Sequence, residues 1–329
     1  MATISQPLGL GLYGVNGHQV MKEVLHTKGA RLVAVCDIPE DLWPDAFKQG
    51  GSFTVHPSFD ALLDDHDVDI VSLCSKRRAD QAAHALAAID KGKHVYAEKP
   101  CALKESELDL IIDRAKAMGK SFREMSDTVS DNPWYSLRAI ATSGSIGDIV
   151  QVHAQKSYPW HEGRSPDDEI DGGLLPWVGI HAFRMVEQIS GVMIRDVTAA
   201  EETSFGSPRD DGLVMAAACL MQLENGGIAS ITANYLNPRG FPSWGNDAVR
   251  LFGTKGMAEV VDGGQRTRWV VGTEDRGEIP KVPAPASHFQ RFVDSLREGM
   301  FMEMSLEAEL HATRMSLRAR DLTRRNHVK

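Results

Sequence analysis

The sequence predicts an α/β protein of two domains. Residues 1–126 are expected to form a doubly wound parallel sheet, and residues 127–329 a second α/β domain with a large, mostly antiparallel open sheet. In the first third of the chain, short buried-strand patterns alternate with helical patterns, which indicates βαβ units with right-handed crossovers. From 193 to 272, long strand patterns follow one another through glycine-rich turns, which is typical of antiparallel pairing. A length of 329 residues accommodates two such domains.

The first domain is expected to alternate four strands with four helices. The strands are predicted at 8–14, 31–37, 68–75 and 94–100, and the helices at 18–29, 58–65, 79–93 and 104–119. Ser58 is a favourable N-cap for the second of these helices. Gly29 is a natural C-cap for the first.

The second domain begins with a helix, and strands dominate its middle. The predicted elements are a helix at 133–147, a strand at 148–158, a helix in the second half of 171–191, hairpins at 213–236 and 249–261, and closing helices near 285–299 and 305–323. The sequence Asn225-Gly226-Gly227 supplies the turn of the first hairpin. We expect the helices to cover one face of the sheet.

Composition excludes several classes of function. A net charge of −9 argues against a broad nucleic-acid surface, and the short basic run at 76–78 is expected to be solvated. The longest apolar run, 213–223, is too short to span a membrane, and the start of the chain shows no secretory signal. None of the four cysteines forms a C-x-x-C pair, so no metal site is expected. Cys36 and Cys74 are predicted to be buried thiols, which favours a reduced, cytoplasmic protein.

The stretch GLYGVNGHQ (11–19) resembles a phosphate-binding turn in which the glycine pattern is incomplete. In the pattern G-x-G-x-x-G, Gly14 occupies the first position, Asn16 the second and Gln19 the third, with Gly17 between them. A glycine permits the tight turn, and asparagine tolerates a positive φ. The N–H groups that open the following helix would receive phosphate. The alternative interpretation is an ordinary strand–turn–helix.

Two further strand ends favour a nucleotide site. Asp37 follows the second strand about 20 residues after the turn, where an acid accepts the ribose hydroxyls of NAD and repels the 2′-phosphate of NADP. It could instead cap a helix before Pro39, and the basic run at 76–78 keeps NADP open as the less favoured cofactor. At the end of HVYAEKP (94–100), Glu98 and Lys99 point to opposite sides of the strand, unless this end is merely solvated. Pro100 allows either a cis or a trans bond there.

These segments together resemble the Gfo/Idh/MocA family, which is named for glucose–fructose oxidoreductase and inositol dehydrogenase. The resemblance rests on GLYGVNGHQ, VCD, GKHVYAEKP, GGLLPWVGIHAF, LENGGIASI and VRLFGTKGMAEV, and thus covers most of the chain. The block G-K-H-V-x-x-E-K-P is intact at 92–100. The resemblance implies a Rossmann domain that binds NAD(P), a redox step on a sugar, cyclitol or related polyol, and a C-terminal sheet that mediates homodimers or homotetramers.

The resemblance also implies roles for individual residues. Lys99 would contact both nicotinamide and substrate, and His181 would act as the acid/base. The predicted cofactor contacts are Gly14, Asn16, Gly17, His18, Gln19, Asp37, Ser75, Glu98 and Lys99. The substrate half departs from the family pattern, because Trp177 stands where an aspartate usually precedes the histidine and Arg184 where an aspartate usually follows it. The loop SKRRADQ likewise lacks the usual proline and histidine.

Helical spacing places Gly173, Trp177, His181 and Arg184 on one face. His181 is suited to take a hydroxyl proton while Lys99 stabilises the developing alkoxide, although a lone histidine is often a core residue. Trp177 would stack on a sugar ring or pack in the core, and Arg184 would pair with a substrate carboxylate or with a local acid. In the segment 158–173, the predicted substrate contacts are Tyr158, Trp160, Arg164 and Asp171, unless this segment is only an exposed loop.

Three functions are compatible with this pattern. The first is an NAD-dependent dehydrogenase of a sugar or cyclitol. The second uses tightly bound NAD transiently, to assist elimination or hydrolysis of a glycoside, and would release no net NADH. The third is a non-enzymatic nucleotide sensor, against which the intact Lys99 and His181 argue.

Overall fold

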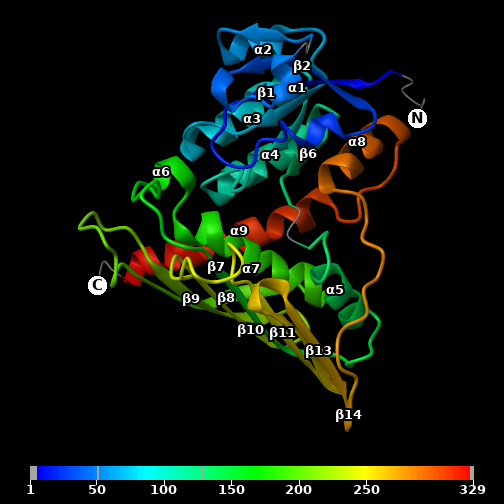
Figure 1. Ribbon diagram of the computed structural model, residues 1–329. Coiled ribbons are helices and arrows are strands. Elements are labelled where there is room, and N and C mark those ends of the chain that lie inside the picture. Colours follow the sequence, from blue (N-terminus) through cyan, green and yellow to red (C-terminus); the bar gives the residue numbers. More distant parts are fainter. Residues whose placement is uncertain (1–5, 50–51, 127–128, 327–329) are drawn as a thin grey trace. The chain divides into compact units, whose positions relative to one another are not determined.

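The computed structural model describes residues 6–49, 52–126 and 129–326, which form two compact units. The first unit comprises the chain up to Ser126 together with Glu169–Asp171 and Ala286–Leu310, and the second comprises the remainder (Figure 1). Residues 1–5, on which the expected lack of a secretory signal partly rests, lie outside the described residues. Residues 127–128, beside the predicted domain boundary, also lie outside them, and that boundary stays a prediction.

The first unit contains a six-stranded parallel sheet in the order β3-β2-β1-β4-β5-β6. Its strands are β1 (Leu8–Tyr13), β2 (Ala30–Cys36), β3 (Thr54–His56), β4 (Ile70–Leu73), β5 (His94–Ala97) and β6 (Phe122–Glu124). The predicted doubly wound sheet is confirmed, with β3 and β6 as additional short strands. Strand order reverses between β1 and β4, and the crevice at the carboxyl ends of these strands is where such sheets bind ligands.

The helices of this unit come from both ends of the chain. They are α1 (Asp45–Lys48), α2 (Phe59–Asp64), α3 (Gln81–Asp90), α4 (Glu105–Ala117) and α8 (His288–Glu298). Ser58 caps α2 as predicted, accepting a hydrogen bond from the Ala61 N–H. Helix α8 contributes Phe289, Phe292 and Val293 to the same apolar cluster as β1. A segment made near the end of the chain therefore completes the core of the N-terminal sheet.

The predicted helix at 18–29 is wrong. Only a single 3₁₀ turn, Glu23–Leu25, forms there. Val20 and Val24, four residues apart, are buried, but other groups replace the helical hydrogen-bond ladder. The Lys28 N–H donates to Gln290 of α8, and the Gln290 side chain donates back to the Lys28 carbonyl. Tertiary partners thus satisfy this backbone without a regular helix.

The second unit is built on an eight-stranded sheet in the order β14-β13-β12-β11-β7-β10-β9-β8. Its strands are β7 (Ile149–Ser157), β8 (Ile194–Thr203), β9 (Ala216–Leu223), β10 (Ile228–Asn234), β11 (Ala248–Gly253), β12 (Gly256–Val261), β13 (Arg266–Val271) and β14 (Glu274–Asp275). Both predicted hairpins form, as β9–β10 and β11–β12. Strands β7 and β10 pair in parallel, and the other neighbours pair antiparallel.

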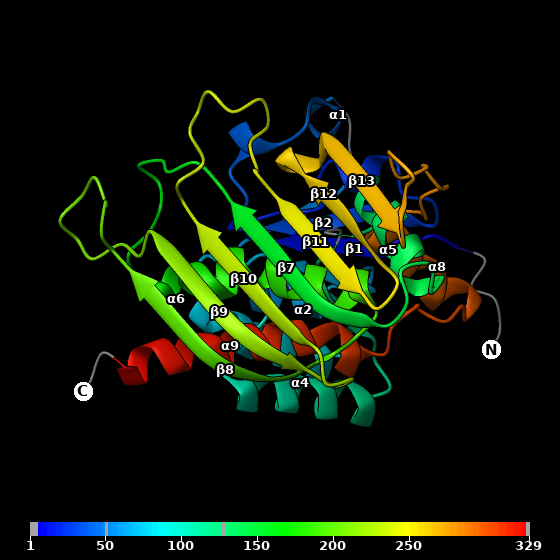
Figure 2. The same ribbon diagram turned by 90° about the horizontal axis from the view of Figure 1, so that it is seen from below.

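Helices cover one face of this sheet, as predicted (Figures 1 and 2). They are α5 (Trp134–Thr142), α7 (Ile180–Arg184) with π-helical turns on either side (Leu175–Gly179 and Met185–Ile189), and the C-terminal part of α9 (Leu306–Asn326). The short helix α6 (Asp168–Asp171) precedes them. The opposite face of the sheet carries no helix among the described residues, and apolar side chains are exposed there. Leu220 on β9 is 55% exposed and Ile228 on β10 is 50% exposed.

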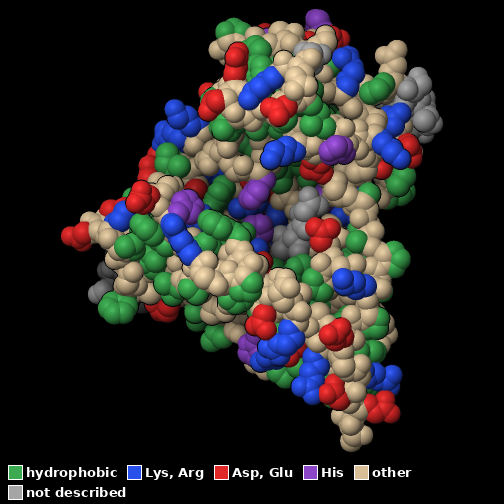
Figure 3. Space-filling model, in the orientation of Figure 1, with side chains coloured by type: hydrophobic (Ala, Val, Ile, Leu, Met, Phe, Trp, Pro, Cys, Tyr) green, Lys and Arg blue, Asp and Glu red, His purple; other side chains and the backbone are tan. Residues whose placement is uncertain are grey.

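All four cysteines are buried and free, which confirms the prediction for Cys36 and Cys74. No described helix combines the length and the apolar character needed to span a bilayer. On the face shown in Figure 3, basic and acidic side chains are interspersed. The expectation that the basic run at 76–78 is solvated is wrong for Arg78, because its side chain is fully buried.

Candidate functional site

The glycine turn lies at the carboxyl end of β1, beside the point where strand order reverses. Gly14 has φ +70° and Gly17 has φ +118°, a region that favours glycine. A Cβ atom on Gly14 would overlap the Cys74 carbonyl oxygen, and one on Gly17 would overlap the Glu98 carboxylate. The turn therefore needs glycine at both positions, although Gly17 does not occupy a glycine position of the usual pattern.

Replacing Gly14 with alanine is expected to destabilise the first unit and weaken dinucleotide binding by about tenfold or more, because the new methyl group meets backbone rather than a movable side chain. Gly119→Ala is the matched control, since Gly119 also has positive φ (+61°) but has no atom within 4 Å of its Cβ position. Thermal unfolding and NAD titration of both variants would measure the difference. Equal behaviour of the two would contradict a steric role for Gly14.

The side chains of Asn16 and Gln19 anchor the turn. Asn16 Nδ2 donates to the carbonyls of Lys76 (3.0 Å) and Ile170 (2.8 Å). Gln19 Nε2 donates to the carbonyls of Tyr13 and Gly14, and Gln19 Oε1 accepts from the Ser72 hydroxyl. Asn16 and Gln19 therefore stand at two glycine positions of the usual pattern, and their side chains form hydrogen bonds with nearby backbone carbonyls. The chain after the turn forms only the 3₁₀ turn Glu23–Leu25, so among the described residues no α-helix follows the turn to supply the N–H groups that we expected to receive phosphate.

Glu98 fastens the turn to the end of β5. Its Oε2 accepts from the His18 N–H and lies 2.9 Å from His18 Nδ1, and its Oε1 accepts from the Lys99 N–H at 2.8 Å. The carboxylate is fully buried. Burial by itself raises its pKa, but the His18 hydrogen bond and the charges of Lys99, His18 and Arg78 outweigh that effect and lower the pKa to about 2. Glu98 is therefore a buried anion near neutral pH.

Arg78 and Gln81 are site residues that the sequence did not reveal. Arg78 Nη2 donates to the Asn16 carbonyl at 2.6 Å, and Nη1 donates to Gln81 Oε1. Gln81 Nε2 in turn donates to the carbonyls of Glu98 and Pro100. Together they connect the loops after β1, β4 and β5. The only signal in the sequence was their position after a predicted parallel strand, where ligand-binding loops gather.

The remaining predicted contacts of the first unit differ in accessibility. Asp37 is exposed at the end of β2, with φ +54°. Ser75 is buried, and its hydroxyl lies 2.9 Å from His84 Nδ1. Lys99, which is 2% exposed, precedes a cis bond to Pro100. Asp171 also belongs to this unit and is buried close enough to Arg78 to raise the pKa of that guanidinium, against a larger lowering by burial.

In the second unit, the helical segment 174–190 presents two side chains outward. Trp177 and His181 are partly exposed, whereas every other residue of the segment is buried. This agrees with the predicted face for Trp177 and His181. Arg184 does not share that face, because the helix runs into the core and its guanidinium is fully buried. The neighbouring Glu187 binds His311, at 2.6 Å from Nδ1.

A group of aromatic and basic side chains follows β7, and we call it the aromatic–basic cluster. Its members are Lys156, Tyr158, His161, Arg164, Tyr235, Trp244 and Asp247. Lys156 Nζ lies 2.5 Å from Asp247 Oδ2 and 4.8 Å from the centroid of the Tyr158 ring. The Tyr158 and His161 rings lie 6.3 Å and 6.1 Å from the Trp244 ring. Arg164 lies over the Tyr235 ring, at 4.3 Å.

The structure thus brings together two of the predicted substrate contacts, Tyr158 and Arg164. Trp160 is partly buried and packs against the core of the unit. Helix α7 packs on β7 and β10, the strands that lead into the cluster. The sequence did not identify Lys156 as a site residue. Alternation along β7 places it on the buried side with Val152 and Ala154, and burying a lysine without a partner costs free energy.

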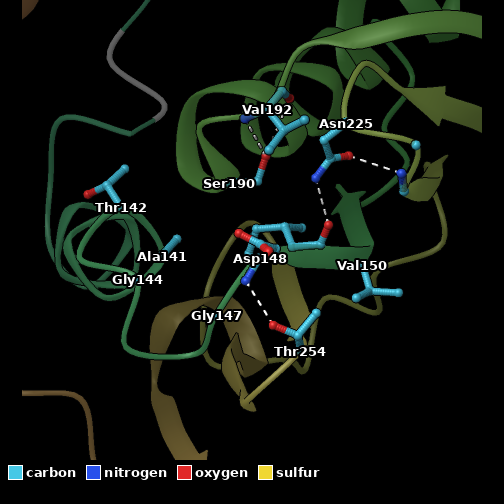
Figure 4. Close-up of a pocket in the computed structure, with 13 residues that line it drawn as sticks. Ala141, Thr142, Gly144, Gly147, Asp148, Val150, Ser190, Val192, Asn225 and Thr254 are labelled. Carbon is cyan, nitrogen blue, oxygen red and sulfur yellow. Dashed lines mark hydrogen bonds between the residues drawn. The ribbon is translucent and has the colours of Figure 1, made fainter.

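A separate pocket of about 730 Å³ lies at the other end of β7 (Figure 4). Glycines and small side chains form most of its lining, and Asp148 is its one carboxylate among the described residues. The Asp148 N–H donates to Thr254 Oγ1, and Asn225 donates to the Ile149 carbonyl. None of the predicted site residues lines it. The nine residues of β7, roughly 30 Å in length, separate it from the cluster.

The residues of the first unit fit a dinucleotide. Two positive-φ glycines shape the turn at the strand reversal, and an exposed acid ends the second strand. With its second unit built on an open, mostly antiparallel sheet, the molecule has the architecture of a two-domain, dinucleotide-dependent oxidoreductase. Comparison with known protein families identifies the family to which the chain belongs. Residues 8–125 match an oxidoreductase family with an NAD-binding Rossmann fold, and residues 134–259 match the GFO/IDH/MocA C-terminal domain. The chain belongs to the Gfo/Idh/MocA family.

Named relatives have related activities. A trans-1,2-dihydrobenzene-1,2-diol dehydrogenase from Bos taurus is 25% identical over 70% of this chain and 66% of its own length. A myo-inositol 2-dehydrogenase from Thermotoga maritima is 23% identical over 82% of this chain and 78% of its own. A 3-ketoreductase from Actinomadura kijaniata, solved with TDP-benzene and NADP, superimposes with a TM-score of 0.78 at 17% identity, covering 96% of this chain and 97% of its own.

Proposed function

We propose that the protein is an NAD-dependent dehydrogenase of a sugar, cyclitol or related polyol. The observation that carries this proposal is the buried Glu98–Lys99 pair at the end of β5, with Glu98 attached to the glycine turn. The pair joins the expected nucleotide turn to a lysine suited to act on a hydroxyl group. Relatives named as inositol and dihydrodiol dehydrogenases support the same substrate class.

In this proposal each unit supplies one part of the chemistry. When bound, NAD would supply the hydride acceptor for oxidation and, once reduced, the hydride donor for reduction. Lys99 holds the substrate hydroxyl oxygen, and its ammonium stabilises the negative charge that develops on that oxygen. The imidazole of His181 accepts the hydroxyl proton in oxidation and returns it in reduction. The aromatic–basic cluster orients the ring of the substrate.

We propose NAD rather than NADP as the cofactor. Asp37 is exposed at the position where a 2′-phosphate would meet its carboxylate. The basic run at 76–78 was the reason for considering NADP, but two of its three side chains already have partners. Arg77 pairs with Glu169, and the buried Arg78 donates a hydrogen bond to the Asn16 carbonyl. Four free, buried cysteines support a cytoplasmic location as part of this proposal.

The test is formation of the reduced cofactor by the purified protein with sugars, cyclitols and glycosides, measured as NADH from NAD and, in parallel, as NADPH from NADP. The proposal expects NADH with one substrate class and a clear preference for NAD. Bound NAD without NADH formation, while a glycoside is consumed, would instead support transient redox chemistry. Bound NAD with every compound unchanged would support a nucleotide sensor.

We further propose that the helix-free face of the eight-stranded sheet joins copies of this chain into a dimer or tetramer. Exposed apolar side chains such as Leu220 and Ile228 lie on that face, and exposed apolar patches of this kind are typical of interfaces.

Leu220→Glu is expected to convert the oligomer to a monomer of 36.1 kDa, because it places a charge within the apolar part of the interface. Leu110→Glu is the control, since Leu110 is 56% exposed on α4 of the first unit. Light scattering after gel filtration measures the mass of each variant. A monomeric unsubstituted protein, or dissociation by both substitutions alike, would contradict the proposal.

A further inference from the structure

The side chain of Arg164 has no acidic partner among the described residues. Two other cations of the second unit do have one: the buried Lys156 pairs with Asp247, and the half-buried Arg209 pairs with Asp211 at 2.9 Å. The described residues give Arg164 no hydrogen bond from its side chain, and its Nε atom is buried without an acceptor. A guanidinium is always charged and carries five donors in a planar fork. This arrangement leaves a directed cation available for a ligand.

Aromatic rings hold that guanidinium in place. Its central carbon lies 4.3 Å from the centroid of the Tyr235 ring and 5.7 Å from that of Tyr158. Tyr235 is buried, so one wall of the contact is rigid. Stacking of this kind fixes the plane of the guanidinium while leaving its N–H groups in that plane free to bind.

The backbone that carries Arg164 is held separately. Arg209 donates from Nη2 to the Arg164 carbonyl at 2.7 Å and from Nη1 to the Glu162 carbonyl at 3.0 Å. The Arg164 N–H donates to the His161 carbonyl at 3.1 Å. A cation held at both backbone and side chain needs little further ordering on binding, which favours affinity.

The net charge of the aromatic–basic cluster favours a negatively charged ligand. Asp247 is the cluster's one acid, and Lys156 already occupies it. Burial acts to lower the pKa of Lys156, but Tyr158 and Asp247 raise it overall, so Lys156 also stays charged. The positive charges of Arg164 and Arg239 both lower the pKa of His161, after the larger effect of burial. Arg164 therefore adds a positive charge that no acid among the described residues neutralises through an ion pair.

We propose that Arg164 binds an oxyanion of the substrate, and that the substrate is a sugar or polyol carrying a carboxylate or phosphate group. The inference rests on the proposed function and specifies its substrate class. The planar fork matches the two oxygens of either anion, while the rings of Tyr158 and Trp244 offer apolar faces to the carbon skeleton. Neutral sugars would leave the Arg164 guanidinium without an anion.

Calorimetric titration of the full-length protein with NAD present tests this. The probes are D-glucose, D-glucuronate and D-glucose 6-phosphate, which share a ring and differ in charge. We expect at least one charged probe to bind roughly tenfold or more tightly than glucose. The two charged probes distinguish a carboxylate site from a phosphate site.

Arg164→Gln is expected to abolish that preference, so that the charged probe binds with an affinity similar to that of glucose. Arg239→Gln is the matched control, because it removes the same charge from an exposed neighbouring position and should retain the preference. Arg164→Lys keeps the positive charge but lacks the planar guanidinium. It should therefore retain only part of the preference for the charged probe. Circular dichroism melting of each variant checks that it folds.

The inference is overturned if neither charged probe binds more tightly than glucose to the unsubstituted protein, or if Arg164→Gln retains the preference. NADH measured in the same samples separates this result from the proposed function. A dehydrogenase indifferent to substrate charge would refute the anion site alone. Arg164-dependent binding of an acid without any redox change would refute the dehydrogenase alone.

Discussion

Lys99→Met is expected to lower kcat of the dehydrogenase by about 10²- to 10⁴-fold. The substitution removes the charge proposed to stabilise the alkoxide while keeping most of the apolar volume of a side chain that is 2% exposed. It leaves the Lys99 N–H, which donates to Glu98, in place. NAD binding should therefore change much less than kcat.

Initial rates with saturating substrate, together with NAD titration by fluorescence, separate these two effects. Lys116→Met is the control, because Lys116 is exposed on α4 and its loss changes the net charge equally. A Lys99→Met enzyme with kcat within about threefold of the unsubstituted enzyme would remove Lys99 from the proposed chemistry. An equal loss of NAD affinity would assign it to cofactor binding instead.

Glu98→Gln is expected to lower the free energy of unfolding by about 3 kcal/mol at pH 7. The pKa of Glu98 falls from 4.5 to about 2 in the folded protein, and each unit of difference corresponds to about 1.4 kcal/mol. Because the folded pKa is the lower one, this stabilisation is fully present above about pH 4.5. It is lost as the pH falls toward 2.

Urea unfolding at pH 7 and pH 3 measures this directly. The difference in free energy of unfolding between the Glu98→Gln variant and the unsubstituted protein should be smaller by roughly 2 kcal/mol at pH 3 than at pH 7. Asp113→Asn, an exposed substitution on α4, should show almost no difference at either pH. A gap that does not depend on pH would mean that Glu98 acts through packing and not through its charge.

Periodicity and turn residues predicted most of the architecture. Alternation of buried strands with helices predicted the parallel sheet, and Asn225-Gly226-Gly227 correctly placed a hairpin. The prediction of a helix after Gly14 was wrong because the spacing of Val20 and Val24 reveals only which face is buried. It does not reveal the distant groups that form hydrogen bonds with this backbone in place of helical partners. Those groups, Glu98 and Gln290, lie far away in the sequence.

The candidate site was predictable where backbone conformation dictates the residue. The motif places a glycine at the tight turn, and Gly14 there has a positive φ. Asn16, chosen as a residue that tolerates positive φ, is not among the described residues that adopt it. Arg78 was assigned to solvent because a short basic run does not show that one member is buried on the Asn16 carbonyl. The lack of an acidic partner for Arg164 among the described residues also depends on three-dimensional neighbours, and only the structure reveals it.

The position of α8 has a consequence for the order of events during synthesis. The N-terminal sheet shares an apolar cluster with Phe289, Phe292 and Val293, which emerge from the ribosome about 160 residues after Ser126, roughly 8–30 s later at ordinary rates of translation. Until then, the surface of β1 that these side chains cover stays open to water and to other chains. The nascent N-terminal sheet therefore lacks these core side chains until the segment that carries them has been synthesised.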